Sequence, residues 1–409
     1  MMKILIFGET STVSSLKSAC ELRGFEPVVL YEKELCSPCD YDVIDIWREP
    51  TQIAYDLKER YGVPAGIVNC IEQYVGVLDA VCHKLGLITA NASAARTLRS
   101  KALMKECWEK HRVPTPRVFH KGPGVPPQLS GEDFPVIVKP VYGAASAGVV
   151  LAHDQKELER ARQGAARFNA TALGKEGHAR SGIMIEEYVD GPEFCVDQVW
   201  QSGRAVAQGV LAKGVPRAPD FMDRLYLADP DTPADELWAL CDTAREAVMA
   251  AGVRHGATHT EVRRDERSGE YVVIEAALRP GAGCGLYPTY KRAYGNDFFS
   301  ALVDACIGLA RKDGDMLPEP ASDRHYWYNV GYSVSGRILS LDLPETFYEK
   351  HPYVDRVIWR RRVGDYLPRE GSTYGYLAWF EGVLPAGEDP EALLRSAGQD
   401  LIVKVDDGQ

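Results

Sequence analysis

The stretch VIEAALRPGAG, residues 273–283, places a carboxylate, a guanidinium and several small residues on one expected strand. Side chains alternate along a strand, so Glu275, Ala277 and Arg279 project from the same face. The apolar residues at 272–274 indicate that this strand is largely buried, and an unpaired buried acid is costly. Glu275 therefore needs a partner, which could be Arg279 in an ordinary salt bridge or a bound cation.

A second acidic strand precedes this one along the chain. Residues 257–263 and 271–277 have β-strand character, and the polar, turn-rich linker RDERSGE between them predicts an antiparallel hairpin. Glu261 and Glu275 then face one another and would repel unless a cation lies between them. Mg²⁺ binds few protein carboxylates and completes its shell with water and phosphate oxygens. The pair therefore predicts a metal site, although paired glutamates are also common on solvated sheet faces.

Small residues follow a lysine in the stretch VIVKPVYGAASAGV, residues 136–149. An apolar strand ends at Lys139, and the small residues of 143–148 would let backbone amides approach phosphate oxygens closely. The lysine would supply a positive charge for the same oxygens. No Gly-Lys-Ser/Thr opens a helix here, so this is not a Walker A motif. The alternative is a tight hairpin with an exposed lysine.

Acidic residues gather in IEEYVDGPEFCVD, residues 185–197. Glu186 and Glu187 end one strand, and Glu193 begins the returning strand after a turn at Asp-Gly-Pro. Carboxylates accept hydrogen bonds from the exocyclic amine of adenine and from ribose hydroxyls, so these residues suit a nucleoside. Solvated acids on a hairpin are the alternative interpretation.

The composition limits the classes of function. The chain has 409 residues, 45% hydrophobic and 26% charged, and a formal net charge of −11, which argues against a broad nucleic-acid or anionic-membrane surface. The N-terminal apolar run is too short for a signal peptide, and no stretch approaches a membrane span, so a cytoplasmic protein is expected. The 10 cysteines are scattered and are expected to be reduced thiols. Cys36 and Cys39 lack a second zinc-ligand pair nearby and are expected to be exposed loop thiols.

The order of expected strands and helices predicts an α/β and α+β protein of three parts. The chain opens with a β-α-β unit that lacks the G-x-G-x-x-G of a dinucleotide site. A helix over 155–162 leads into a polar, glycine- and alanine-rich stretch at 164–182, which predicts a loop. The expected parts are an open parallel α/β domain (1–95), a core (96–315) and a small α+β domain (316–409).

These motifs, taken in chain order, resemble the ATP-grasp superfamily and are most similar to its L-amino-acid ligases. The resemblance covers roughly residues 65–310. The segments that carry it are SKALMKECWEKHRVPTP (100–116), IVKPVYGAASAGV (137–149), MIEEYVDGPEF (184–194), THTEV (258–262) and IEAALRPGAG (274–283). The resemblance implies an ATP-grasp fold in which the core (96–315) has two lobes, the small one at about 115–190, and binds a nucleotide.

The resemblance also implies roles for residues that bind ATP and Mg²⁺, with Mn²⁺ as an alternative metal. The roles are these: Lys101 and Lys139 contact phosphates; Gly143, Ser146, Ala147 and Gly148 belong to a loop that closes over them; Glu186 and the backbone of Glu187 and Val189 bind adenine; Glu193 binds ribose; Lys213 adds a phosphate contact; Glu261 and Glu275 hold the metal.

The implied reaction joins a carboxylate to an amine through an acyl phosphate and releases ADP and phosphate. Lys139 and Arg279 would stabilise charge on the reacting groups, and His259 could be a general base or a neutral structural histidine. Many family members have asparagine where this chain has Ala277, and the L-amino-acid ligases also tend to have a small residue there. The alternatives are a purine- or biotin-type ligase or carboxylase, and an inert nucleotide-binding module.

The substrates are expected to be a small-molecule carboxylate and an amine, most simply two amino acids. Their pockets are expected to use residues 283–297, the neighbourhood of Glu72 and aromatic residues of the last domain. Lys291 or Arg292 could bind a substrate carboxylate, or both could lie on a solvated helix. No nucleic acid or membrane partner is expected, and a homodimer is the default oligomeric state.

Overall fold

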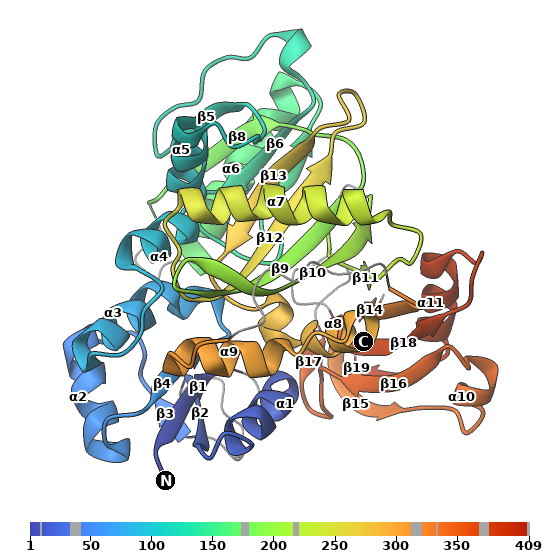
Figure 1. Cartoon of the computed structure of the whole chain (residues 1–409). Helices are drawn as coiled ribbons and strands as arrows, with labels where there is room; N and C mark the ends of the chain where they lie inside the picture. Colours follow the sequence, from blue (N-terminus) through green and yellow to red (C-terminus); the bar gives the residue numbers. More distant parts are fainter. Residues whose placement is uncertain are drawn as a thin grey trace.

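The computed structural model describes residues 1–8, 10–32, 42–172, 180–215, 221–311, 321–332, 334–367 and 376–406. Four sheets and the helices between them make up this part of the chain (Figure 1). None of its helices combines the length and the apolar character needed to cross a membrane. Cys36 and Cys39 lie outside the described ranges.

The N-terminal unit is a parallel sheet with strand order β3-β2-β1-β4. Its core side chains on β1 are fully buried because helices and loops cover both faces of the sheet. The open parallel α/β domain expected from the sequence is therefore confirmed. The elements are β1 (Lys3–Phe7), α1 (Thr10–Glu21), β2 (Glu26–Glu32), β3 (Asp42–Ile44), α2 (Pro50–Tyr61), β4 (Gly66–Asn69) and α3 (Val75–Leu85).

Two helices lead from this unit to a small lobe with strand order β5-β8-β6-β7. Ser100 caps the second helix, since its side chain accepts a hydrogen bond from the backbone N–H of Leu103. The elements are α4 (Ala92–Arg99), α5 (Lys101–His111), β5 (Val118–Gly122), β6 (Val136–Pro140), β7 (Val150–Ala152), α6 (Gln155–Ala172) and β8 (Ile183–Glu187).

Helix α6 corrects one expectation. The sequence predicted a loop from residue 164, but the helix continues to Ala172. Leu158, Ala161 and Ala165 recur at helical spacing and pack against β6 and β8, so burial of this stripe maintains the helix past Gly164. Residues 173–179 of the expected loop lie outside the described part of the chain.

The largest sheet has eight strands in the order β13-β12-β9-β10-β11-β14-β18-β16. Helix α7 crosses one face of it, as Figure 1 shows. The predicted hairpin of β12 and β13 is confirmed. The elements are β9 (Glu193–Gln201), β10 (Arg204–Gly214), β11 (Leu225–Leu227), α7 (Ala234–Ala250), β12 (Gly256–Arg264), β13 (Tyr271–Ala277), α8 (Tyr287–Tyr294), α9 (Phe298–Ile307), β14 (Arg324–Gly331), β16 (Val354–Trp359) and β18 (Tyr376–Leu384).

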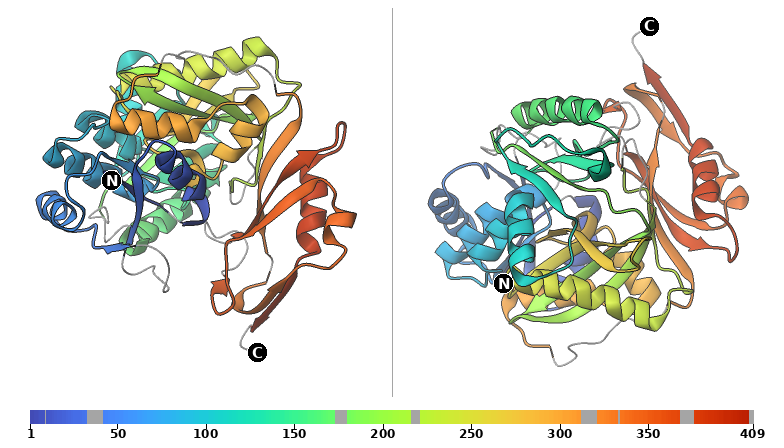
Figure 2. Two further views of the ribbon diagram at one scale, coloured as in Figure 1. Left: turned by 60° about the horizontal axis from the view of Figure 1, so that its bottom comes forward. Right: turned by 90° about the horizontal axis from the view of Figure 1, so that it is seen from above.

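The C-terminal residues extend this large sheet and add a smaller one. Strands β14, β18 and β16 pair with the core through β11, so the C-terminal part stands beside the core rather than apart from it (Figure 2). The boundary at 315/316 stays a prediction. The further elements are β15 (Gly336–Asp342), α10 (Phe347–Lys350), β17 (Tyr366–Leu367), α11 (Pro390–Gln399) and β19 (Ile402–Asp406).

Candidate active site

A cavity of about 830 Å³ lies where the N-terminal unit, the small lobe, the large sheet and the C-terminal strands meet. It collects most of the residues that the sequence singled out. Those that line it are Lys101, Lys139, Gly143, Ser146, Ala147, Glu186, Glu187, Val189, Glu193, His259, Glu261, Glu275 and Arg279. Gly148 and Lys213 are not among the lining residues. Segments far apart in the sequence thus form one site.

Two lysines from different elements lie at the small-lobe end of the cavity. Lys101 begins α5, and its Nζ lies 2.8 Å from Glu275 Oε1 and donates to the carbonyl of Gly143 at 3.3 Å. Lys139 on β6 forms an ion pair with Glu186. Both lysines are buried, so their charges are poorly screened by water. They can stabilise phosphate oxygens placed between them.

The loop after β6 has the backbone conformation that its small residues permit. Ala145 and Ser146 have φ of 52° and 56°, and Gly143 and Gly148 are also in the positive-φ region. A Cβ on Gly148 would lie 3.0 Å from Pro140 Cγ. The loop is therefore shaped by local sterics that larger side chains would disturb.

Sequence reasoning missed Lys105, which lies one helical turn after Lys101. Its Nζ is 3.2 Å from Glu186 Oε2 and donates to Thr115 Oγ1 at 2.6 Å. Burial lowers the pKa of Lys105 to about 8. Burial opposes ionisation of Glu186 as well, but the two lysines beside it hold its pKa below the ordinary value. The i,i+4 spacing of the two lysines was the available signal.

The backbone near the adenine candidates already has partners. The N–H of Glu187 donates to the carbonyl of Arg117 at 2.8 Å, and the carbonyl of Val189 accepts from Arg263 at 2.8 Å. Arg263 Nε also donates to Glu193 Oε2 at 2.9 Å. Arg263, another residue that sequence reasoning missed, therefore fixes the segment that joins β8 to β9.

Glu261 and Glu275 are directly paired across the β12–β13 hairpin, as the sequence predicted. Each carboxylate contacts a lysine, Glu261 with Lys213 at 2.8 Å and Glu275 with Lys101 at 2.8 Å. Burial raises the pKa of both acids, but the lysines outweigh it and both pKa values lie below the ordinary range. Two ionised carboxylates that line the cavity are a suitable donor set for a divalent cation.

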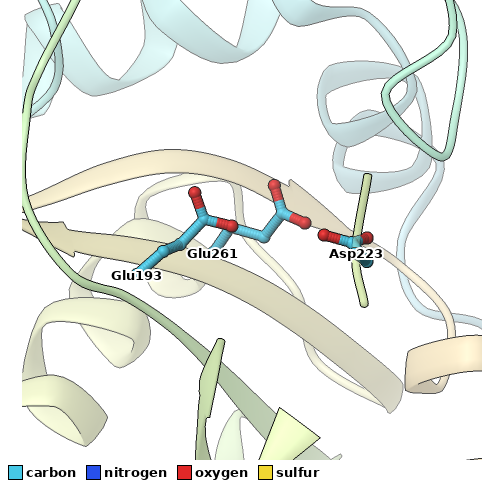
Figure 3. A group of neighbouring side chains, drawn as sticks. All are labelled: Glu193, Asp223 and Glu261. Carbon is cyan, nitrogen blue, oxygen red and sulfur yellow. The ribbon is translucent and has the colours of Figure 1, made fainter. Parts of the chain in front are cut away.

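A second acidic group consists of Glu193, Asp223 and Glu261, whose carboxylates converge in Figure 3. Lys213 Nζ lies within ion-pair distance of all three, at 2.6 Å from Asp223 and 2.8 Å from Glu261. The ammonium therefore supplies the positive charge that balances these three carboxylates. Burial and the neighbouring acids raise the pKa of Asp223, while the three carboxylates raise that of Lys213 against the effect of burial.

Arg279 and His259 are each oriented by a neighbouring acid, and sequence reasoning predicted neither contact. Arg279 Nε donates to Glu72 Oε2 of the N-terminal unit at 3.0 Å. His259 Nδ1 lies 2.5 Å from Asp197 Oδ1, and Asp197 Oδ2 accepts from the backbone N–H of Gly281 at 3.1 Å. Asp197 is completely buried, so this carboxylate links β9, β12 and the loop after Arg279.

The close approach at Gly281 leads to a stability prediction. A Cβ at this position would lie 2.7 Å from Asp197 Oδ2 and 2.8 Å from His259 Nδ1. Gly281→Ala is expected to lower the free energy of unfolding by about 1–3 kcal/mol, because the packed groups must move apart. Urea denaturation measures this. Gly164→Ala, a helical position with open space around it, is the control and should cost nothing. Equal losses of unfolding free energy in both variants would show that close packing around Gly281 does not determine the effect.

Lys291 and Arg292, which the sequence offered for a substrate carboxylate, do not line the cavity. The Lys291 side chain is 58% exposed and lies 3.8 Å from Asp297. Arg292 donates to Glu381 at 3.3 Å. Lys291 therefore lies on a solvated helix, and Arg292 forms an ion pair with Glu381.

Comparison with known proteins agrees with this geometry. The ATP-grasp domain family matches residues 132–287. Alanine–anticapsin ligase of Bacillus subtilis (strain 168) is 26% identical over 295 residues, which is 66% of this chain and 59% of that protein. D-alanine–D-alanine ligase of Pseudomonas putida (strain GB-1) is 27% identical over 223 residues, 52% of this chain and 63% of that protein. The chain thus spans less than two thirds of either relative.

Solved structures extend the likeness over the whole chain. L-amino acid ligase from Bacillus licheniformis superposes with a TM-score of 0.85 at 20% identity and covers 99% of both chains. The biotin carboxylase domain of Hydrogenobacter thermophilus 2-oxoglutarate carboxylase, solved with MgADP, has a TM-score of 0.69 at 16% identity, over 99% of this chain and 91% of that one. The chain thus contains a segment that matches the ATP-grasp domain family, and its fold is that of the L-amino acid ligase structure. In sequence, the chain is similar to ligases of amino acids.

Proposed function

We propose that this protein is an ATP-dependent carboxylate–amine ligase that joins an amino acid to an amine or a second amino acid. The observation that carries the proposal is the meeting of Lys101, Lys139, the Glu261–Glu275 pair and Arg279 around one cavity. Phosphate-binding cations, a carboxylate pair suited to a metal and a guanidinium for an oxyanion are the parts that acyl-phosphate chemistry needs.

In the first step, a carboxylate oxygen of the acid substrate attacks the γ-phosphorus of ATP, and the bond to the β,γ-bridging oxygen breaks to release ADP. Lys101 and Lys139 stabilise the charge that spreads over the transferred phosphoryl oxygens. Both are buried, which strengthens their interaction with the developing charge. The product is an acyl phosphate.

In the second step, the amine nitrogen attacks the acyl carbon, and phosphate leaves as the amide bond forms. Arg279 stabilises the oxyanion of the tetrahedral intermediate. His259, oriented by Asp197, is the candidate acceptor for the proton that the amine loses. Residues 143–147 line the cavity and help to keep water from the acyl phosphate.

Glu261 and Glu275 would hold Mg²⁺, with Mn²⁺ as an alternative. When bound, the metal neutralises phosphate charge and polarises the reacting phosphoryl group. The two carboxylates fit this role because they are paired across the hairpin, line the cavity and have lowered pKa values. Lys101 contacts Glu275 and Lys213 contacts Glu261 in this structure. When ATP is bound, these two lysines would instead bind phosphate oxygens.

Two alternatives follow from the same fold. Ala277 disfavours a purine- or biotin-type ligase or carboxylase, because the strand then lacks the asparagine that many members of the superfamily have at this position. Ala277 pairs with His259 in the β12–β13 hairpin. An inert nucleotide-binding module is disfavoured because Lys139, Glu261, Glu275 and Arg279 are all present and line one cavity.

ADP release from the purified protein with mixtures of L-amino acids tests the proposal. The expected result is ADP formation that depends on amino acids and is matched by a ligated product. Tight ATP binding without ADP release would favour the inert module. Release that depends on bicarbonate, and not on any amino acid, would favour the carboxylase.

A further inference from the structure

A buried lysine, Lys105, lies beside the cavity and has no role in the mechanism proposed above. Only 1% of its side chain is exposed, and it is not among the residues that line the cavity. It lies one turn along α5 from Lys101, which does line the cavity. An ammonium group in the protein interior costs free energy unless charged and polar partners replace the lost water. The partners of Lys105 therefore indicate its function.

One set of partners ties the ammonium of Lys105 to the hairpin that carries Glu275. Its Nζ donates to Thr115 Oγ1 at 2.6 Å and to the carbonyl of Val273 at 3.4 Å. Thr115 Oγ1 donates to the same carbonyl at 3.1 Å, and the backbone N–H of Val273 donates to the carbonyl of Pro114 at 2.9 Å. The ammonium is thus anchored to the backbone of β13 and to the segment that follows α5.

The remaining partner is the carboxylate of Glu186 on β8, whose side chain is 2% exposed and lines the cavity. Lys139 forms an ion pair with Oε1, and Lys105 Nζ lies 3.2 Å from Oε2. Burial opposes ionisation of Glu186, but the charges of the two lysines hold its pKa below the ordinary value. No described residue donates a hydrogen bond to Oε2. Buried acceptors without a donor are uncommon in folded proteins, so a donor from a ligand is expected at this oxygen.

The cavity beside Glu186 suits a flat, apolar ring that carries a hydrogen-bond donor. Ile137 is the cross-strand partner of Glu186, so both side chains leave the small-lobe sheet on the same face. Pro116 and Ile274 also line the cavity. Ligand sites commonly combine apolar walls with a few polar groups that fix the orientation of the ligand. The 6-amino group of adenine is a donor that matches an ionised carboxylate in such surroundings.

We infer that Lys105 is a positioning residue for the nucleotide, which holds the Glu186 carboxylate so that its Oε2 accepts a hydrogen bond from the 6-amino group of adenine. The inference rests on the binding of ATP in the proposed function. Lys105 acts through Glu186, because it does not line the cavity itself. Its anchor on β13 also fixes this acceptor of the small lobe relative to the strand that carries Glu275.

A purely structural lysine is the alternative role, and the two roles differ in their effect on nucleotide selectivity. Loss of a structural lysine weakens the binding of every nucleotide alike. Loss of a positioning residue weakens the binding of nucleotides that carry the 6-amino group. Purine riboside 5′-triphosphate lacks this group and is otherwise identical to ATP. The ratio of the two dissociation constants therefore separates the roles, and it does not depend on the fraction of the protein that is folded.

Isothermal titration calorimetry in the presence of Mg²⁺ measures the Kd of both nucleotides. The wild-type protein is expected to bind ATP at least about tenfold more tightly than purine riboside triphosphate, since hydrogen bonds to charged groups are among the stronger ones. Lys105→Met should weaken ATP binding about tenfold and purine riboside triphosphate binding less than about threefold, because only ATP loses an oriented acceptor. Thr115→Ala keeps the charge and removes one anchor, so it should lower the ratio about threefold.

Lys110→Met is the matched control, because Lys110 lies on the same helix and is exposed, and its ratio should equal that of the wild type. A wild-type ratio in Lys105→Met, or an equal loss for both nucleotides, would overturn the inference. Equal binding of both nucleotides by the wild type would also overturn it. If Lys105→Met does not fold, the ratio in Thr115→Ala decides by the same criteria.

Calorimetry measures binding without turnover, so the inference and the proposed function can fail separately. The expected ratios without ADP release from any amino acid would contradict the ligase proposal and support the inference. ADP release with an unchanged ratio in Lys105→Met would do the reverse. Absence of ATP binding by the wild-type protein would overturn both.

Discussion

Glu275→Gln is expected to reduce ADP release at least about 100-fold. The substitution removes one of two carboxylates proposed to hold the metal, whose stabilisation of the transferred phosphoryl group amounts to several kcal/mol. The amide can still accept a hydrogen bond from Lys101 Nζ, which now lies 2.8 Å from Glu275 Oε1. Thermal unfolding should therefore show a folded protein. Steady-state rates at saturating Mg²⁺ and amino acids measure the effect.

Glu270→Gln is the matched control for this variant. Glu270 is exposed in the turn just before β13, so it removes the same charge from the same hairpin without touching the cavity. Its rate should equal that of the wild type. A near-normal rate for Glu275→Gln would rule out the metal role of the Glu261–Glu275 pair.

Lys213→Met is expected to destabilise the protein by about 3 kcal/mol. Its ammonium is the shared partner of Glu193, Asp223 and Glu261, and methionine would leave one buried and two partly buried carboxylates close together. Removing one partner of a buried ion pair leaves uncompensated charge at a cost of about 3–5 kcal/mol. The lower value is expected here, since the side chains of Asp223 and Glu261 retain some exposure to water.

Urea unfolding at neutral pH measures this loss, with Lys156→Met as the comparison. Lys156 is exposed on α6, so its substitution should change the free energy of unfolding by less than about 0.5 kcal/mol. Added Mg²⁺ should recover part of the stability of Lys213→Met, because the three carboxylates then lack their cation. Equal stability of the two variants would show that Lys213 does not hold the acidic group together.

Local sequence patterns predicted the parts of the site that lie within one or two neighbouring strands. The hairpin predicted from the polar linker placed Glu261 opposite Glu275, and the structure confirms this pairing, with a β-bulge between Glu261 and Val262 that shifts the register. The alternation along the second strand placed Ala277 on the same face, and it pairs with His259. Lys101 and Lys139 are far from these strands in sequence, and only the ATP-grasp resemblance predicted that they belong to the same site. Both lysines line the cavity.

Contacts between distant segments could not be predicted in the same way. Asp197 lies on a strand of buried residues, and only the pairing of β9 with β12 brings it opposite His259. Asp223 reaches Lys213 from a separate segment, and Arg360 enters the cavity only because β16 joins the large sheet through β18. Nothing in the local spacing of these residues indicates such partners.

The sequence predicted too short a helix α6 for a different reason. Glycine costs a helix about 1 kcal/mol relative to alanine, and the polar, glycine- and alanine-rich stretch from Gly164 was therefore interpreted as a loop. In the folded protein, Ala161 and Ala165 pack against the small lobe, and burial outweighs this local preference. The composition of the segment does not reveal this packing against the small lobe.

Transfer of ¹⁸O from a labelled amino acid carboxylate to phosphate tests the central claim most directly. If the carboxylate attacks the γ-phosphorus and phosphate leaves on attack by the amine, each released phosphate carries one ¹⁸O atom and the ligated product keeps the other. Mass spectrometry of both products measures this. Released phosphate without the label, together with no ligated product, would mean that water attacks ATP and would contradict the assignment of an acyl-phosphate ligase.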